Sequence, residues 1–226
     1  MNNTNYIPAL RYSWLTAFYD WLIRITLPEK EFKNELIDGA AFQVGQNVLD
    51  FGVGTATLSI LIKKKYPMTT VIGIDVDPKI LKIAERKIQK KNLEIDLVKY
   101  EGVEIPLKDN SLDKVVSSLV FHHLLLAQKK TAFSEIYRVL KINGKLHVAD
   151  WGKPSNFFMR LLAYPFQLFD GYKNTKVNIN GKLPEIMQEA GFKNVIVLKK
   201  YNTVFGTLQL FEATKPMTSN INFSLN

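Results

Sequence analysis

Two glycines follow an apolar run that ends in an aspartate, in the stretch VLDFGVGTATLS. Gly52 and Gly54 can adopt backbone angles that are closed to other residues, and they leave room for a ligand against the main chain. A helix is expected to begin near Thr55, and its unpaired N–H groups would face the same place. This spacing predicts a ligand that is held by backbone atoms after a strand.

Two classes of ligand are bound by such a loop. A dinucleotide site calls for a third glycine at position 57, where this chain has Thr57, so that signature fails. The stretch is instead similar to the VLDxGxGTG motif of the class I S-adenosylmethionine-dependent methyltransferases, with departures at Val53 and Ala56. The resemblance implies that Gly52, Gly54 and Thr55 contact the cofactor S-adenosyl-L-methionine. It also implies that Asp50 organises the loop and the ammonium group of the cofactor.

The next motif is GIDVDP, which ends the following predicted strand. A carboxylate at Asp75 can accept two hydrogen bonds from the ribose hydroxyls of a nucleoside. Val76 follows it and is counted with the cofactor site. The alternative role of an ordinary helix-capping aspartate fits Asp77 better than Asp75.

A third segment, YEGVEIPLKDNSLDKVVSSLVFHHL, resembles the family's GDAExLPFxDxSFDxVxSxxxxHH pattern. The resemblance places Glu101 and the N–H of Gly102 at the adenine edge, with glutamate where aspartate is usual. It places Ser118 along the methionine part of the cofactor. A fourth segment, IYRVLKINGKLHVADW, looks like RVLKPGGxL followed by the family's fifth strand. Over residues 48–150 the resemblance is to the small-molecule branch related to ubiquinone and menaquinone biosynthesis methyltransferases.

The candidate catalytic residues are His122 and His123, which follow the fourth predicted strand. A methyltransferase must mainly align the nucleophile, methyl carbon and sulfur and exclude water, and its need for a base depends on the acceptor. Either histidine is a candidate base; the alternative is that one packs and the other caps a helix. Tyr19, Trp151 and Phe166 are candidates for the acceptor pocket, with core packing as the alternative.

These residues need strands and helices in alternation to position them. The strands are expected at 47–51, 71–75, 95–99, 114–118, 145–150, 195–200 and 207–214, and the helices at 56–66, 78–90, 131–141, 157–169 and 183–190. Asn143-Gly144 is expected to end the third helix. The fold class is therefore α/β: a Rossmann-like, doubly wound, mostly parallel seven-stranded sheet with helices on both faces and the last strand antiparallel.

One domain is expected across residues 1–226. It divides into an N-terminal helical cover (1–46), a cofactor-binding core (47–150), a lid insert (151–182), a final helix and strands (183–214) and a frayed tail (215–226). The aromatic stretches Tyr6–Leu27 and Phe157–Tyr172 supply the cover and the lid, and they favour a lipophilic or aromatic acceptor.

Composition bounds the remaining choices. The chain has 226 residues, 46% of them hydrophobic, and no cysteine, so disulfides and thiolate metal sites are excluded, and no metal is expected. The N-terminus lacks the layout of a secretory signal, and no apolar run reaches the length that crosses a bilayer, which predicts a cytoplasmic protein. Peripheral contact with a membrane stays open, and the oligomeric state is not fixed by the sequence.

The net charge of +9 raises the alternative of a nucleic-acid partner. Only five of the 30 cationic residues are arginines, and the lysines are spread along the chain, whereas phosphate-reading surfaces tend to recruit arginine. The sequence therefore predicts a methyltransferase that acts on a small-molecule acceptor. The alternatives are an RNA methyltransferase and a non-catalytic cofactor-binding protein of the same fold.

Overall fold

The structure is a computed structural model that describes residues 27–217, except for the side chains of residues 165, 166 and 168–170. Its strands form one sheet in the order β3-β2-β1-β4-β5-β7-β6. The strands are β1 (Asn47–Phe51), β2 (Thr70–Asp75), β3 (Asp96–Lys99), β4 (Leu112–Ser118), β5 (Leu140–Trp151), β6 (Lys193–Thr203) and β7 (Gly206–Thr214). Neighbours are parallel except β7, which is antiparallel to β5 and β6. The predicted fold class is confirmed.

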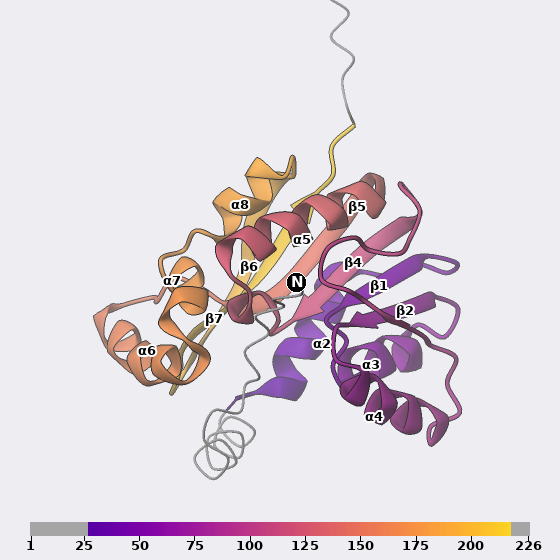
Figure 1. Cartoon of the computed structure of the whole chain (residues 1–226), viewed down its shortest axis with the longest axis horizontal. Coiled ribbons are helices and arrows are strands. Elements are labelled where there is room, and N and C mark those ends of the chain that lie inside the picture. Colours follow the sequence, from indigo (N-terminus) through magenta and orange to yellow (C-terminus); the bar gives the residue numbers. More distant parts are fainter. Residues whose placement is uncertain (1–26, 218–226) are drawn as a thin grey trace, which may run out of the picture.

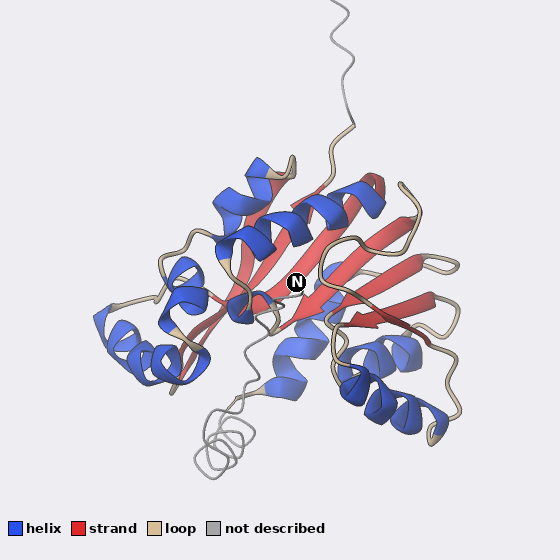
Figure 2. Cartoon of the chain, viewed as in Figure 1, coloured by secondary structure: helices blue, strands red, loops and turns tan. Residues whose placement is uncertain are grey.

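Helices cover both faces of this sheet (Figures 1 and 2). Their bounds are α2 (Glu29–Ala40), α3 (Thr57–Lys65), α4 (Pro78–Gln89), α5 (Leu126–Val139), α6 (Phe157–Asp170), α7 (Tyr172–Ile179) and α8 (Leu183–Glu189). Helices α2 and α3 share one apolar core, and α4 packs beside α3, whereas α5 and α8 bury a second core on the opposite face. Helices α6 and α7 follow β5 and lie together at one end of the sheet (Figure 1).

Local sequence explains where α4 begins. The Asp77 carboxylate accepts the N–H of Lys79 at 2.8 Å, and Pro78 occupies the first turn, where its missing N–H is not needed. The chain therefore turns sharply from β2 into α4. This turn leaves Asp75 at the carboxyl edge of the sheet.

The predicted end of the third helix is wrong. Helix α5 runs from Leu126 to Val139, and Asn143-Gly144 lies inside β5 instead of stopping the helix. Asn143 has φ 62°, and the pairing of β5 with β4 shifts register between Leu140 and Lys145. The Asn-Gly pair thus forms a bulge, where asparagine tolerates the left-handed conformation.

Two helices were not predicted as separate elements. Helix α2 falls in the region expected to be an N-terminal cover, and α7 follows α6 after Gly171, which has φ 88°. The aromatic stretch Tyr6–Leu27, apart from its last residue, lies outside the described residues. In the described part of the chain, no helix has the length and apolar character needed to cross a membrane.

The strand order fixes where a ligand can bind. Strands β1 and β4 are neighbours, yet β1 continues into α3 on one face and β4 leads into α5 on the other. This reversal opens a crevice at the carboxyl ends of the two strands, which is where open α/β sheets bind ligands.

Candidate active site

The loop between β1 and α3 is held by two glycines with positive φ, 74° at Gly52 and 52° at Gly54. A Cβ atom added at Gly52 would lie 2.4 Å from a methyl carbon of Val120, so the space beside Gly52 is taken by protein. A Cβ atom added at Gly54 would meet nothing within 4 Å. The room for a ligand therefore lies beside Gly54, whereas Gly52 lets the loop pack against the segment that follows β4.

A pocket of about 140 Å³ opens beside this loop. It is smaller than a site that encloses a whole drug-sized ligand, so it can hold one end of such a molecule. It is lined by Glu29, Lys33, Asp50, Gly52, Val53, Gly54, Thr55, Thr57, Leu58 and Ser118. The structure thus brings together five of the residues predicted to bind the cofactor: Asp50, Gly52, Gly54, Thr55 and Ser118.

Ser118 shows that the pocket suits a polar ligand. Its Oγ is buried and has no hydrogen-bond partner among the described residues. A buried hydroxyl in this state is uncommon, since nearly all buried polar groups are satisfied by protein or by another molecule. A polar group of a bound ligand would supply the missing partner.

Asp50 brings a buried carboxyl group to the same pocket. Its Oδ2 accepts hydrogen bonds from the N–H and the hydroxyl of Ser59, at 3.1 and 2.6 Å. Burial raises the pKa of Asp50 to about 6, because the bonds from Ser59 and the positive charge of Lys33 offset only part of the cost of desolvation. A cation that enters the pocket would favour the ionised form of Asp50.

Asp75 anchors the loop from the neighbouring strand. One carboxylate oxygen accepts the N–H of Gly54 at 2.9 Å, and the other accepts the N–H of Asp77 at 3.0 Å. An ionised carboxylate has about four acceptor positions, so two remain for the hydroxyls of a ribose. Replacing Asp75 by alanine would therefore loosen the loop as well as remove a ligand contact.

The other residues predicted for the cofactor lie on the same edge but do not line the pocket. Val76 is exposed after β2, and Glu101 is exposed after β3, where it pairs with Lys99 at 2.7 Å. Gly102 has φ 85° and open space where a side chain would be. Their roles at the adenine remain predictions.

Five residues that line the pocket were not predicted: Val53, Thr57 and Leu58 in and after the glycine loop, and Lys33 and Glu29 on α2. Lys33 and Glu29 lie one turn apart on α2 and form an ion pair of 2.6 Å, with Lys33 only 8% exposed. In the sequence they look like an ordinary pair on the surface of a helix. Only the packing of α2 beside the loop shows that the pair faces the pocket, so the sequence carried no usable signal.

The two histidines lie in a 3₁₀ turn, Phe121–His123, between β4 and α5, so they do not open the helix itself. The Nδ1 atom of His122 is 2.8 Å from the Asp150 carboxylate at the end of β5, and both side chains are buried. His123 is more exposed, and its ring centroid lies 3.9 Å from that of His122. Neither histidine lines the pocket beside Gly54.

Asp150 is the centre of this buried polar group. It accepts the N–H groups of Phe121 and Trp151, each at 2.7 Å, and an N–H of the Asn178 side chain at 3.2 Å. Burial alone would raise the pKa of Asp150, but the charge and hydrogen bond of His122 and the N–H of Trp151 hold it below its ordinary value. Asp150 is therefore ionised at neutral pH and orients the imidazole.

Helix α7 is fixed to the histidine turn by polar contacts. The ammonium group of Lys129, which is fully buried, donates to the carbonyl oxygens of Leu124 and Asn174, and the Asn174 amide donates to the carbonyl of His123. Burial lowers the pKa of Lys129 to about 8. These bonds hold α7 beside the turn that carries both histidines.

Of the three residues predicted for the acceptor pocket, Trp151 is the one whose side chain the structure describes. Trp151 is buried in the core cluster of α2, β6 and β7 and does not line the pocket beside Gly54. Phe166 lies in α6, but its side chain is outside the described part of the structure, and Tyr19 lies outside it altogether. In residues 27–217 no group of three or more histidine, aspartate or glutamate side chains could hold a metal ion.

Comparison with known proteins agrees with this geometry. Residues 49–148 match a family model described as a methyltransferase domain. The chain is 33% identical over 178 residues to the demethylmenaquinone methyltransferase of Lactobacillus johnsonii, covering 70% of this chain and 72% of that protein. It is 27% identical over 216 residues to an uncharacterized methyltransferase of Synechocystis, covering 94% and 96% of the two chains.

Solved structures show the same fold. A SAM-dependent methyltransferase from Aquifex aeolicus has a TM-score of 0.63 at 21% identity, over 87% of this chain and 97% of that one. Phosphoethanolamine N-methyltransferase 2 of Haemonchus contortus, in complex with S-adenosyl-L-methionine, has a TM-score of 0.67 at 17% identity. The match covers 83% of this chain and 53% of that longer chain.

The raised pKa of Asp50 predicts how cofactor binding depends on pH. Its pKa of about 6 lies above the ordinary 3.8, so ionising it costs stability in the empty protein as the pH rises through 6. If Asp50 binds the ammonium group of S-adenosylhomocysteine in its ionised form, affinity should rise up to about tenfold from pH 5 to pH 7 and then level off. Calorimetric titration at several pH values measures this. An affinity that is flat between pH 5 and pH 7 would contradict a role for the Asp50 charge.

The position of Lys33 predicts a selective loss. We expect Lys33→Met to weaken S-adenosylhomocysteine about tenfold, because a charged hydrogen bond to the carboxylate of the ligand is lost. Binding of 5′-methylthioadenosine, which lacks the amino-acid end, should stay within about twofold. Lys30→Met, on an exposed position of the same helix, is the control. Equal losses for both ligands would show that Lys33 does not face the amino-acid end.

Proposed function

Because this chain belongs to the class I S-adenosylmethionine-dependent methyltransferases, we propose that it methylates a small quinol- or phenol-type acceptor. The observation that carries the proposal is the 33% identity to a demethylmenaquinone methyltransferase, over 72% of that relative. A second demethylmenaquinone methyltransferase, from Thermus thermophilus, is 27% identical over 171 residues. The acceptor of these relatives is assigned to this chain only as part of the proposal.

The bound cofactor supplies a methyl group that is already activated on a sulfonium, so the protein has to hold the reactants in line and keep water out. Asp75 would hold the ribose while its other acceptor positions keep Gly54 in place. Ser118 and Asp50 would bind the methionine part together with Lys33 and Glu29. Each of these atoms is positioned by a strand end or by a helix, so the site needs little rearrangement when the cofactor binds.

The pair of His122 and Asp150 supports a hydroxyl or carbon acceptor that must lose a proton. The carboxylate can only accept a hydrogen bond, so Nδ1 of His122 carries the proton and Nε2 is the basic nitrogen. An ionised aspartate also stabilises the imidazolium that forms when the base takes a proton. A neutral amine acceptor would need no such pair.

The rivals have less support. An RNA methyltransferase would be favoured by the charge of +9, but the lysines are spread along the chain and only five of the 30 cationic residues are arginines. A non-catalytic cofactor-binding protein would not need the buried pair of His122 and Asp150. The similarity to phosphoethanolamine N-methyltransferase 2, at 17% identity, is a similarity of fold alone.

Methyl transfer to a panel of acceptors tests the proposal. Purified protein with labelled cofactor should methylate a short-chain demethylmenaquinol at least about a hundredfold faster than phosphoethanolamine or total RNA, since each 1.4 kcal/mol of differential transition-state binding gives a factor of ten. Mass spectrometry of the product then locates the new methyl group. Transfer to RNA or phosphoethanolamine in preference to every quinol and phenol would overturn the assignment.

The base has its own test. We expect His122→Gln to lower the turnover of the quinol about a hundredfold and to remove the acidic limb of its pH profile, while the affinity for S-adenosylhomocysteine stays within about twofold. His123→Gln is the matched control on the neighbouring, more exposed ring. An unchanged pH profile in the His122 variant would show that the transfer needs no base from this pair. A loss of turnover in the His123 variant alone would assign the role of base to His123.

A further inference from the structure

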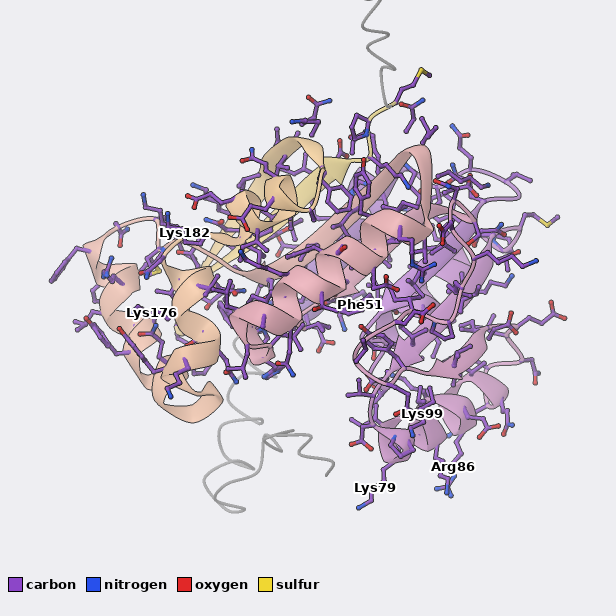
Figure 3. The ribbon with its side chains drawn as sticks, turned by 45° about the horizontal axis from the view of Figure 1, so that its top comes forward. Phe51, Lys79, Arg86, Lys99, Lys176 and Lys182 are labelled. Atoms are coloured by element: carbon purple, nitrogen blue, oxygen red, sulfur yellow. The ribbon has the colours of Figure 1, made fainter. Side chains whose placement is uncertain are left out.

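Residues 151–182 differ in charge from the rest of the chain. They hold five cationic residues, Lys153, Arg160, Lys173, Lys176 and Lys182, and a single acidic one, Asp170. The five cationic side chains are all exposed. Figure 3 labels Lys176 and Lys182 at the end of the molecule that carries α6 and α7. Lys182 pairs with Glu185 at 2.8 Å, so the excess of positive charge at this end comes from the other four cationic residues.

The same segment exposes large apolar side chains. Phe157 is 82% exposed and Phe158 is 61% exposed, and they are joined by Leu161, Tyr164 and Tyr172. On α6 the exposed positions 157, 158, 161 and 164 fall on one face of the helix. Single exposed apolar residues are ordinary, but a continuous face of aromatic side chains marks a surface that binds something apolar.

The other face of α6 is already packed. Ala163 is buried, and a Cβ atom added at Gly206, the first residue of β7, would lie 3.3 Å from the Cβ of Ala163. Helix α6 also contacts α7 and β7. Among the described side chains of α6, Ala163 and Gln167 are the buried ones, so the exposed aromatic side chains take no part in this inward packing. A helix that is apolar on both faces is expected only where both faces meet an apolar environment.

From this arrangement we propose that the outward face of α6 docks the protein on the surface of an anionic lipid bilayer, with Phe157, Phe158 and Leu161 in the acyl boundary. The surrounding lysines and Arg160 lie where phosphate headgroups would be. Lys176 also sits 5.6 Å from the ring of Tyr172, a residue type that prefers the membrane interface.

The positive charge of residues 151–182 favours an anionic bilayer, and disfavours a second copy of this chain, as the occupant of this surface. A second copy would bring an equally cationic segment against the first, because both copies carry a charge of +4 over residues 151–182. An anionic lipid surface instead attracts each lysine or arginine, and the attraction adds to the insertion of aromatic side chains. The proposal deepens the assignment of a quinol acceptor, because a prenylated quinol resides in a bilayer.

Flotation with lipid vesicles tests the apolar contribution. The full-length protein should bind vesicles of equal parts phosphatidylcholine and phosphatidylglycerol, and the double variant Phe157→Ser, Phe158→Ser should bind at least about tenfold more weakly. The control is Val44→Ser, Met68→Ser, which removes two apolar side chains that are 81% and 65% exposed in the loops before β1 and β2. An unchanged melting temperature in the variant excludes misfolding.

A second pair of variants tests the charge. Lys173→Gln, Lys176→Gln should weaken binding about fivefold or more, and Lys79→Gln, Lys82→Gln on exposed positions of α4 should not. Raising the salt from about 0.1 M to about 1 M should release most of the protein, since the Debye length falls from about 10 Å to about 3 Å. Vesicles of phosphatidylcholine alone should bind weakly.

Failure of the docking surface can be distinguished from failure of the proposed acceptor. Equal binding by the Phe157, Phe158 variant and the wild type, or equal effects of the α4 and α7 lysine pairs, would overturn the docking surface. A concentration-dependent dimer that the phenylalanine substitutions dissolve would overturn it as well. If no quinol or phenol is methylated but vesicle binding follows α6, the proposed acceptor fails and the docking surface stands.

Discussion

The close packing of Val120 on Gly52 joins the two halves of the site. No other residue type fits at position 52, because φ is 74° and a Cβ atom would lie 2.4 Å from a methyl carbon of Val120. The loop that faces the cofactor and the turn that carries His122 are therefore in direct contact. Since Asp75 holds the far side of the loop through the N–H of Gly54, a shift in either half would be passed to the other. Contacts between strand ends thus fix the residues that are proposed to bind the cofactor.

Asp50 and Asp150 show that hydrogen-bond donors and nearby charges, more than burial, decide whether the pKa of a buried carboxyl group is raised or lowered. Asp50 and Asp150 are almost completely buried, yet the pKa of Asp50 is raised to about 6 and that of Asp150 is lowered. Asp150 has a histidine and several N–H donors around it, whereas the hydrogen bonds of Asp50 within residues 27–217 come from Ser59, with Lys33 nearby. A cationic group of a ligand would therefore stabilise the ionised form of Asp50, whereas hydrogen-bond donors of the protein already stabilise the ionised form of Asp150.

The sequence predicted the fold class and the cofactor because both depend on local pattern. Buried strands, the glycine loop and the cap at Asp77 are each encoded within a few residues, and β1 has the predicted bounds. Lys33 and Glu29 were missed because their place in the pocket depends on how α2 packs, which no local pattern states. The Asn143-Gly144 pair was misread because the same dipeptide serves a helix end and a strand bulge, and only its pairing with β4 decides between them. The sequence could not decide whether Trp151 lines the acceptor pocket or packs in the core, because either role places it at the end of the same strand.

The net charge of +9 is informative only when the positions of the cationic side chains on the molecule are compared. Figure 3 labels cationic side chains at both ends of the molecule, with Lys79, Arg86 and Lys99 at the α4 end and Lys176 and Lys182 at the α7 end. Near α4 the excess of positive charge is as large, since residues 78–91 hold six cationic residues and a single acidic one, Glu85, but this stretch contains no aromatic residue. Around α6 and α7, Lys182 pairs with Glu185, and Asp170 is the one acidic residue among the other four cations of residues 151–182. This end differs from the α4 end because large aromatic side chains are exposed on the same segment. An excess of lysine that looks like compositional bias along the chain therefore becomes, at one end of the fold, a surface with both charge and apolar area. Only that combination has the chemistry of a lipid interface; the same charge without the rings is an ordinary solvated face.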